Sequence, residues 1–364
     1  FSTTDLDGDS VLPNEEVITN VSIQSATDKD ASTTADVATY ENEIEILSPV
    51  AGTPGGGDGF LESNYAITYV PGDLTIAPRA ITLTASDQSK IYGDALSLGN
   101  TAFTTLDKDG DSVLPNGELV DTVTLVSANG VDASTDSDVG TYADNISITP
   151  TATGAATLTG NDVFDQENYN ISYATGDLTI NRRAITLTAS DQSKIYGDVL
   201  ALDDTAFSTT DLDGDSVLPN GEVITNVSIQ SATDKDASTT ADVATYENEI
   251  EILSPVAGTP GSGDGFRESN YDITYVPGDL TINRRDYIVI IDDQKRFAGQ
   301  YFKIDQAAFI LKEKLPNHES IEFINISSLN GLANDPSSPR GYYPDEFVAD
   351  KVIFGTNSFE SSNY

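Results

Sequence analysis

Apolar and polar residues alternate with a period of two along most of this chain. Three segments show it clearly: Ile185-Thr-Leu-Thr-Ala189, Val123-Thr-Leu125 and Ile44-Glu-Ile46. This is the period of a β-strand with one buried face, whereas a helix repeats every 3.6 residues. A turn with glycine joins Tyr169-Asn-Ile-Ser-Tyr173 to Leu178-Thr-Ile180 and predicts a hairpin. The pattern therefore predicts an all-β protein, and residues 306–315 are the best candidate for a helix.

The sequence is internally repeated. Residues 1–76 recur at 207–282, differing only at Glu15, Gly56, Leu61 and Ala66. A more divergent copy lies between them, since the segment that begins at Arg79 returns at Arg183. Self-similarity at a fixed period is typical of arrays of small domains.

We divide the chain into four repeats, named repeats one to four, at residues 1–78, 79–181, 182–284 and 285–364. Repeat one lacks its first strand and repeat four its closing strands, so we expect a piece of a longer protein. The fold expected for each repeat is an elongated β domain, either a sandwich or β-grasp-like. No flexible spacer separates strands at Asn181-Arg-Arg183, so we expect the domains to stack end to end as a semi-rigid rod on the order of 150 Å long.

Composition removes several classes of function. Without cysteine and with one histidine, the chain can form neither a disulfide framework nor a multi-histidine metal site, and we expect no enzyme. A net charge of −41 argues against binding to nucleic acid. No apolar run approaches the roughly 20 residues of a membrane span.

Recurring motifs resemble a known family. Ile-Tyr-Gly-Asp stands at 91–94 and 195–198, and Asn-Tyr-x-Ile-(Thr/Ser)-Tyr followed by Gly-Asp-Leu-Thr-Ile closes the first three repeats. This pattern resembles the MBG domain, YGX type, found in tandem in large bacterial surface adhesins. The resemblance implies an extracellular, cell-surface location and a β-rich filament. In repeat four Tyr-Gly-Asp becomes Ala298-Gly-Gln300, so the resemblance is weaker there.

An acidic loop recurs in the first three repeats. Carboxylates stand at positions 1, 3, 5 and 12, the ligand spacing of an EF-hand loop, and predict a calcium site. The candidate ligands are Asp5, Asp7, Asp9 and Glu16; Asp107, Asp109, Asp111 and Glu118; and Asp211, Asp213, Asp215 and Glu222. In an ungapped alignment, repeat four has Ala308, Ile310 and Lys312 in place of the aspartates, so we expect no calcium there.

Two other interpretations of the acidic loop stay open. Asp-Gly-Asp-Ser is also good turn chemistry, so the loop could be a solvated turn. In addition, Asp-Ser-Val resembles an O-glycosylation signal of secreted bacterial proteins, with candidate acceptors Ser10, Ser112 and Ser216.

The repeated tyrosines allow two interpretations as well. Tyr65, Tyr69, Tyr92 and their copies could form an aromatic sugar platform, but core packing with the hydroxyl at the rim is the expected arrangement. The arginine pairs at residues 182–183 and 284–285 are expected to bridge to carboxylates of the neighbouring repeat.

These observations favour the structural stalk of a secreted bacterial cell-surface adhesin or filament, which extends a distal binding region from the cell. Its partners would be the neighbouring repeats, with any surface glycan or protein bound through regions outside this fragment. One alternative is that the repeats themselves bind carbohydrate or a surface protein. Another is a self-assembling extracellular fibre.

Overall fold

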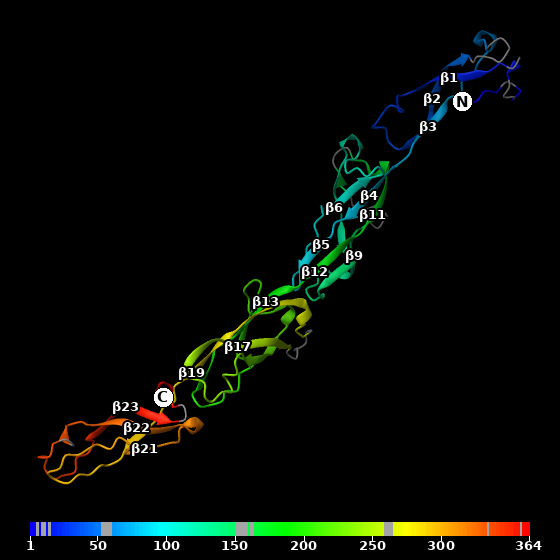
Figure 1. Ribbon diagram of the computed structural model, residues 1–364. Coiled ribbons are helices and arrows are strands. Elements are labelled where there is room, and N and C mark those ends of the chain that lie inside the picture. Colours follow the sequence, from blue (N-terminus) through cyan, green and yellow to red (C-terminus); the bar gives the residue numbers. More distant parts are fainter. Residues whose placement is uncertain are drawn as a thin grey trace. The chain divides into compact units, whose positions relative to one another are not determined.

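The computed structural model describes residues 1–364 except 5–6, 9–11, 14–15, 52–59, 150–158, 161–163, 258–264, 333–334 and 357–358 (Figure 1). The described chain is all-β, as the alternation predicted, and no helix in it reaches seven residues. None of its helices could therefore cross a membrane. Two compact units are present, residues 1–90 with 94–180 and residues 91–93 with 181–364. The division into four repeats stays a prediction.

The first unit contains repeats one and two. In repeat one, β1 (Ile18–Ser25), β2 (Ala38–Ala51) and β3 (Gly72–Ile76) form an antiparallel sheet in the order β1-β2-β3. The described part of repeat two has three sheets, the first of which is β11-β4-β6, made of Tyr169–Ala174, Arg79–Ala85 and Phe103–Asp107. The second is β5-β12-β9-β8, made of Gln88–Ile91, Gly176–Asn181, Gly140–Ile148 and Leu125–Ser127. The third pairs β10 (Thr159–Gly160) with β7 (Val120–Thr122).

The second unit contains repeats three and four. Repeat three has the sheet β15-β13-β18, made of Phe207–Asp211, Arg183–Ala189 and Tyr271–Val276. Its other sheet is β14-β19-β17-β16, made of Gln192–Ile195, Gly278–Asn283, Ala244–Ala257 and Ile224–Ser231. In repeat four β20 (Val289–Ile291) pairs with β21 (Phe309–Leu311), and β22 (Ser320–Ser328) with β23 (Phe347–Thr356).

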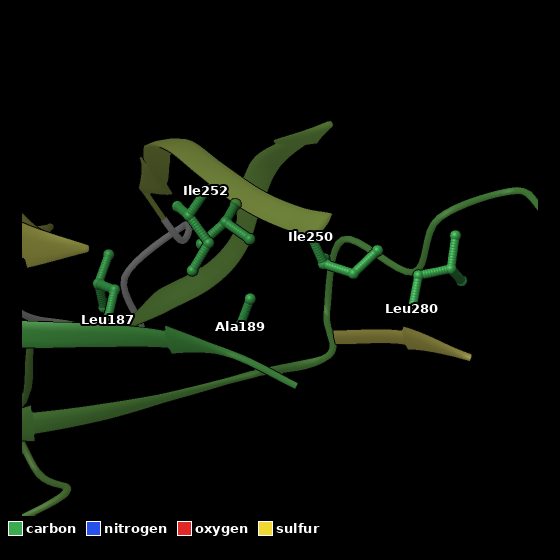
Figure 2. Close-up of a cluster of buried hydrophobic side chains, with 6 residues drawn as sticks. Leu187, Ala189, Ile250, Ile252 and Leu280 are labelled. Atoms are coloured by element: carbon green, nitrogen blue, oxygen red, sulfur yellow. The ribbon is translucent and has the colours of Figure 1, made fainter. Parts of the chain in front are cut away.

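One hydrophobic core lies between the two sheets of repeat three. Leu187 and Ala189 come from β13, whereas Ile250, Ile252 and Leu280 come from the other sheet (Figure 2). Leu187, Ile250 and Leu280 are fully buried. A core shared by two facing sheets is a β-sandwich, so of the two expected topologies the sandwich is the one found here.

The prediction of a helix over residues 306–315 is wrong. Its centre is β21, which pairs antiparallel with β20 from Val289↔Leu311 to Ile291↔Phe309. The Asp292 amide also donates to the Ala308 carbonyl at 2.9 Å. A partner strand that can satisfy the backbone overrides a modest helical propensity.

Candidate functional site

The acidic loop of repeat two is organised by its first aspartate. Asp107, the last residue of β6, accepts backbone N–H bonds from Asp109 at 2.8 Å and Asp111 at 3.0 Å on Oδ1. Its Oδ2 accepts from Nε of Arg79 at 3.1 Å and from the adjacent guanidinium nitrogen. Arg79 also reaches Asp109 at 2.9 Å. Arginine thus supplies the positive charge that the aspartates need.

Repeat three has the same arrangement, but its arginine is more deeply buried. The Arg183 guanidinium lies 2.8 Å from Asp211 and 2.7 Å from Asp213. The side chains of Arg183 and Asp211 are 7% and 3% exposed, so this ion pair is buried. Oδ1 of Asp211 accepts the N–H groups of Asp213 and Asp215, each at 2.9 Å.

These partners shift the aspartate pKa values. The hydrogen bonds from Arg79, followed by the backbone N–H of Asp111, lower the pKa of Asp107 to about 2. Burial alone would raise the pKa of Asp211, but the Arg183 hydrogen bond and the two backbone donors hold it below its usual range. Both carboxylates are therefore ionised at neutral pH.

The glutamate at position 12 of the acidic loop has a tyrosine as its hydrogen-bond partner. Glu16, Glu118 and Glu222 each accept a hydrogen bond of 2.7 Å on Oε2 from the tyrosine of their own repeat, Tyr65, Tyr169 and Tyr271 respectively. Glu118 and Glu222 are buried. The spacing of the loop instead predicted these three glutamates as calcium ligands.

The four predicted ligands of a loop do not converge in repeats two and three. Among the described residues, no group of three His, Asp or Glu side chains is placed to share a metal ion. The donor set does not fit calcium in this conformation, because arginine holds the first aspartate and tyrosine holds the glutamate. Asp5, Asp9 and Ser10 lie outside the described residues, whereas Asp7 is described and exposed. Calcium binding stays a prediction.

The serines of the candidate glycosylation motif are accessible. Ser112 and Ser216 are both exposed in their loops. Their neighbours Val113 and Val217 are exposed by 69% and 73%. An acceptor serine must be accessible, and glycosylation of these two residues stays a prediction.

Repeat four does not carry the acidic loop. Phe309 pairs with Ile291 as Phe103 pairs with Ala85, so Ala308 corresponds to Ala102. The ungapped alignment was therefore wrong, because the segment before Leu315-Pro-Asn is shorter in repeat four. The conclusion that this segment of repeat four lacks the three aspartates is unchanged.

A tyrosine of the Tyr-Gly motif reaches into the following repeat. The turn at residues 91–93 belongs to the second compact unit, where the Tyr92 hydroxyl donates to Oε1 of Glu222. Its ring meets Tyr271 edge to face at 5.5 Å. Nη1 of Arg183 donates to the Tyr92 carbonyl at 3.4 Å. Tyr92 is buried, so its ring packs in the interior as expected and does not form a sugar platform, but its hydroxyl is buried on Glu222 and does not lie at the rim.

The next joint repeats these contacts. The Tyr196 hydroxyl donates to Oε1 of Glu319, and Tyr364 donates to Oε2 at 2.6 Å. The two tyrosine rings lie 5.5 Å apart, edge to face. Arg285 donates to the Tyr196 carbonyl at 2.7 Å and pairs with Asp198. Arg285 therefore bridges to a carboxylate of the neighbouring repeat, as expected, whereas Arg183 binds aspartates of its own repeat.

The residue that follows Tyr92 and Tyr196 must be glycine because a proline of the next repeat lies against it. Gly197 has φ +88°, and a Cβ there would lie 2.6 Å from Cβ of Pro316. Gly93 has φ +90°, and its Cβ would lie 2.4 Å from Cγ of Pro219. Both the left-handed backbone and the close approach exclude a side chain. The Tyr-Gly turn of one repeat thus lies against the Leu-Pro-Asn segment of the next.

Asparagines complete the joints. Asn363 accepts the Val243 N–H at 2.9 Å and donates to Asp242 at 3.1 Å. Between repeats one and two, Asn168 accepts the Val37 N–H at 2.8 Å and donates to Asp36 at 3.3 Å. The same residue type in the same role links two pairs of repeats.

Sequence reasoning missed the glutamate–tyrosine joint, although repeat four carried the signal. It keeps Leu315-Pro-Asn-His-Glu319 while it loses the aspartates. Repeat four keeps the glutamate but not the aspartates, which indicates that the glutamate serves a partner other than calcium.

Residues 185–281 match the family model of the MBG domain (YGX type). The match lies within repeat three and confirms the resemblance drawn from its motifs. It is consistent with a repeat region of a surface-associated, adhesin-type protein. No curated protein matches the chain.

Proposed function

We propose that this chain is part of the stalk of a secreted bacterial adhesin, in which stacked repeats extend a distal binding region away from the cell surface. The repeats act as spacers, and their stiffness is the property that serves the function. We assign them no catalytic role.

The joint between repeats three and four is the observation that supports this proposal. It combines a buried carboxylate between two phenols, a glycine packed against proline, and an ion pair from Arg285 to Asp198. Asn363 also accepts the Val243 N–H at 2.9 Å across the joint. Bending this joint would expose a carboxylate and two rings, so the contacts resist rotation of one repeat against the next.

The connection between these repeats is also short. β19 ends at Asn283, and Arg285 is already fixed to Tyr196. A tether this short cannot act as a flexible spacer. The net charge of −41 adds self-repulsion, which keeps a chain of repeats extended and soluble.

Small-angle X-ray scattering of the whole chain tests the proposal. We expect a maximum dimension on the order of 150 Å that does not change with concentration. The double variant Tyr92→Ala, Tyr196→Ala should give a shorter average dimension and a broader distribution, with unchanged far-UV circular dichroism. Tyr301→Ala is the control, because this tyrosine is 81% exposed. A compact wild-type particle, or identical scattering from all three proteins, would contradict the proposal.

A further inference from the structure

Repeat two contains an exposed asparagine–glycine turn. Asn129 and Gly130 are its central residues, and the Val131 N–H closes it by donating to the Ala128 carbonyl at 3.4 Å. Asn129 has φ +57° and Gly130 φ +67°. Two positive φ angles are the backbone of a type I′ turn, for which Asn-Gly is a favoured pair. The turn therefore explains the choice of residues, but it also presents a reactive dipeptide to water.

Asn-Gly is reactive because the two groups that can join are adjacent. The glycine nitrogen can attack the carboxamide carbon of the asparagine, and no Cβ on the glycine obstructs its approach. At Gly130 a Cβ would meet no heavy atom within 4 Å, so the space beside this residue is open. The carboxamide must turn towards the following nitrogen, so a hydrogen bond that holds it elsewhere slows the reaction.

Two other Asn-Gly pairs have the same backbone but a held carboxamide. Asn116 and Asn220 lie in short 3₁₀ turns as Asn129 does, with φ +60° and +58°, and both are exposed. Nδ2 of Asn116 donates to the Thr33 carbonyl at 2.6 Å. Nδ2 of Asn220 donates to the Tyr92 hydroxyl at 3.4 Å.

The fourth pair is Asn330-Gly331, which is also held. Nδ2 of Asn330 donates to Oε2 of Glu346 at 2.9 Å. Among the contacts of the described residues, Asn129 is the one asparagine of the four without a side-chain hydrogen bond. Its carboxamide can therefore turn towards Gly130 without breaking a contact.

The loop around Asn129 is also less restrained than its counterpart in repeat three. There Thr233 stands in place of Asn129, and the buried Glu249 accepts its N–H at 2.9 Å and its hydroxyl at 3.0 Å. Repeat two has Asn145 at the position of that glutamate. Asn145 donates to the Ala128 carbonyl at 3.4 Å and, among the described contacts, not to Asn129. The carboxylate that fixes this loop in repeat three is thus missing from repeat two.

We propose that the native fold leaves Asn129, of the four Asn-Gly asparagines, open to spontaneous deamidation. The Gly130 nitrogen gives up its proton to hydroxide and bonds to Cγ of Asn129, the bond from Cγ to Nδ2 breaks, and ammonia leaves. Water then opens the succinimide ring at one of its two carbonyls and yields aspartate or isoaspartate. Water and hydroxide are the only co-reactants.

The isoaspartyl product would alter a loop that holds a buried lysine. Nζ of Lys90 donates to the carbonyls of Val131 and Asp132, which follow the turn directly. Lys90 is buried. Isoaspartate routes the backbone through Cβ of Asn129 and lengthens it just before these carbonyls, and either product adds a negative charge.

Peptide mapping of the full chain by mass spectrometry tests the proposal. The chain is incubated at mildly alkaline pH in water enriched in heavy oxygen, which labels the carboxyl group formed on ring opening. Digestion with pepsin in acid stops the reaction. We expect Asn129 to lose its amide at least about fivefold faster than the other three asparagines, the factor that a typical net hydrogen bond supplies. In urea the four rates should become similar, because the same dipeptide is then unrestrained at each site.

Gly130→Ala is the matched variant, because the open space accepts the Cβ while the methyl group obstructs ring closure. It should slow the reaction at Asn129, whereas Gly117→Ala, in the turn of Asn116, should not. Native rates that are equal at the four asparagines, or slowest at Asn129, would overturn the proposal. A lead of Asn129 that persists in urea would overturn it too, since the fold would not be the cause. So would an unchanged rate at Asn129 in Gly130→Ala.

Discussion

The Tyr271 hydroxyl donates a hydrogen bond of 2.7 Å to Oε2 of Glu222, and both residues are buried. The other carboxylate oxygen accepts the hydroxyl of Tyr92, which belongs to the preceding repeat in the sequence. One carboxylate therefore joins the interior of a repeat to its neighbour. Glu319 does the same with Tyr364 and Tyr196.

Removal of one joint hydroxyl should destabilise the second unit. Tyr196→Phe keeps the ring but leaves Oε1 of Glu319 without its phenol donor. We expect the free energy of unfolding to fall by about 1–3 kcal/mol, because a buried carboxylate loses a charge-assisted hydrogen bond. Urea unfolding followed by circular dichroism measures this. Tyr301→Phe, at an 81% exposed site, should change stability by less than about 0.5 kcal/mol. Equal stability of the two variants would show that the joint hydrogen bond contributes nothing.

The joint should also open at alkaline pH. Burial, reinforced by the hydrogen bond to Glu222, raises the pKa of Tyr92 from 10.0 to about 12. The folded state favours the neutral phenol, so its stabilisation is complete below pH 10 and is lost as the pH rises through 12. We expect the unfolding free energy of wild type to fall more steeply over this window than that of Tyr92→Phe. Parallel pH profiles for the two proteins would contradict this.

Local alternation predicted the strands well, but it could not predict which strands need a partner. Residues 271–276 form β18, paired in parallel with β13. Residues 65–70 differ from them only in Ala66, yet they are not a strand, and in repeat one no described strand corresponds to β13. Pairing, not propensity, decides the outcome for this segment.

The candidate site was predicted as a set of residues but not as a set of contacts. Spacing singled out Asp107, Asp109 and Glu118, and all three take part in the recurring structure. Their partners come from Arg79 and Tyr169, which lie far from them in sequence. Spacing within a loop carries no information on such distant donors, so a cation site and an arginine-bound turn have the same sequence signature.

Adjacent arginines provide a matched test of the acidic loop. Arg183 is buried against Asp211 and Asp213, whereas Arg182 is exposed. Arg183→Gln leaves the buried Asp211 carboxylate without its counter-charge, which should cost about 3–5 kcal/mol of stability. Arg182→Gln should cost less than about 0.5 kcal/mol. Thermal unfolding of both variants measures the difference, and similar midpoints would mean that the loop does not need its arginine.

Calcium can be tested in the same way. Because Arg79 and Arg183 already neutralise the first aspartates of repeats two and three, we expect a protein made of these two repeats to melt at the same temperature in millimolar calcium and in EGTA. A ligand at 100 times its dissociation constant would add about 2.7 kcal/mol and raise the midpoint by several degrees. Such a shift, abolished by Asp109→Ala with Asp213→Ala, would establish the calcium site that the spacing predicted.

A second buried carboxylate shapes the loop after β16. Glu249 is 4% exposed and accepts the Ser231 hydroxyl, together with the Thr233 N–H at 2.9 Å and the Thr233 hydroxyl at 3.0 Å. Burial works against its ionisation, but the hydroxyl and backbone donors lower its pKa overall. In repeat one, the hydrogen bond from Ser25 is the main cause that lowers the pKa of Glu43 to about 2.

Neutralising this carboxylate should unfold the loop locally. In Glu249→Gln the amide NH₂ faces donors that have lost an acceptor, and we expect a loss of about 1–3 kcal/mol. Glu251→Gln is the control, since Glu251 accepts only an exposed bond from Gln230 at 2.9 Å among the described contacts. Acid should act in the same direction, because the lowered pKa of Glu249 gives stability that is present above its ordinary pKa of 4.5 and is lost as the pH falls through the lowered value. Hydrogen exchange of the Thr233 and Lys235 amides at pH 7 reports the change directly. Unchanged protection of these amides in Glu249→Gln would mean that the loop is held by its other contacts.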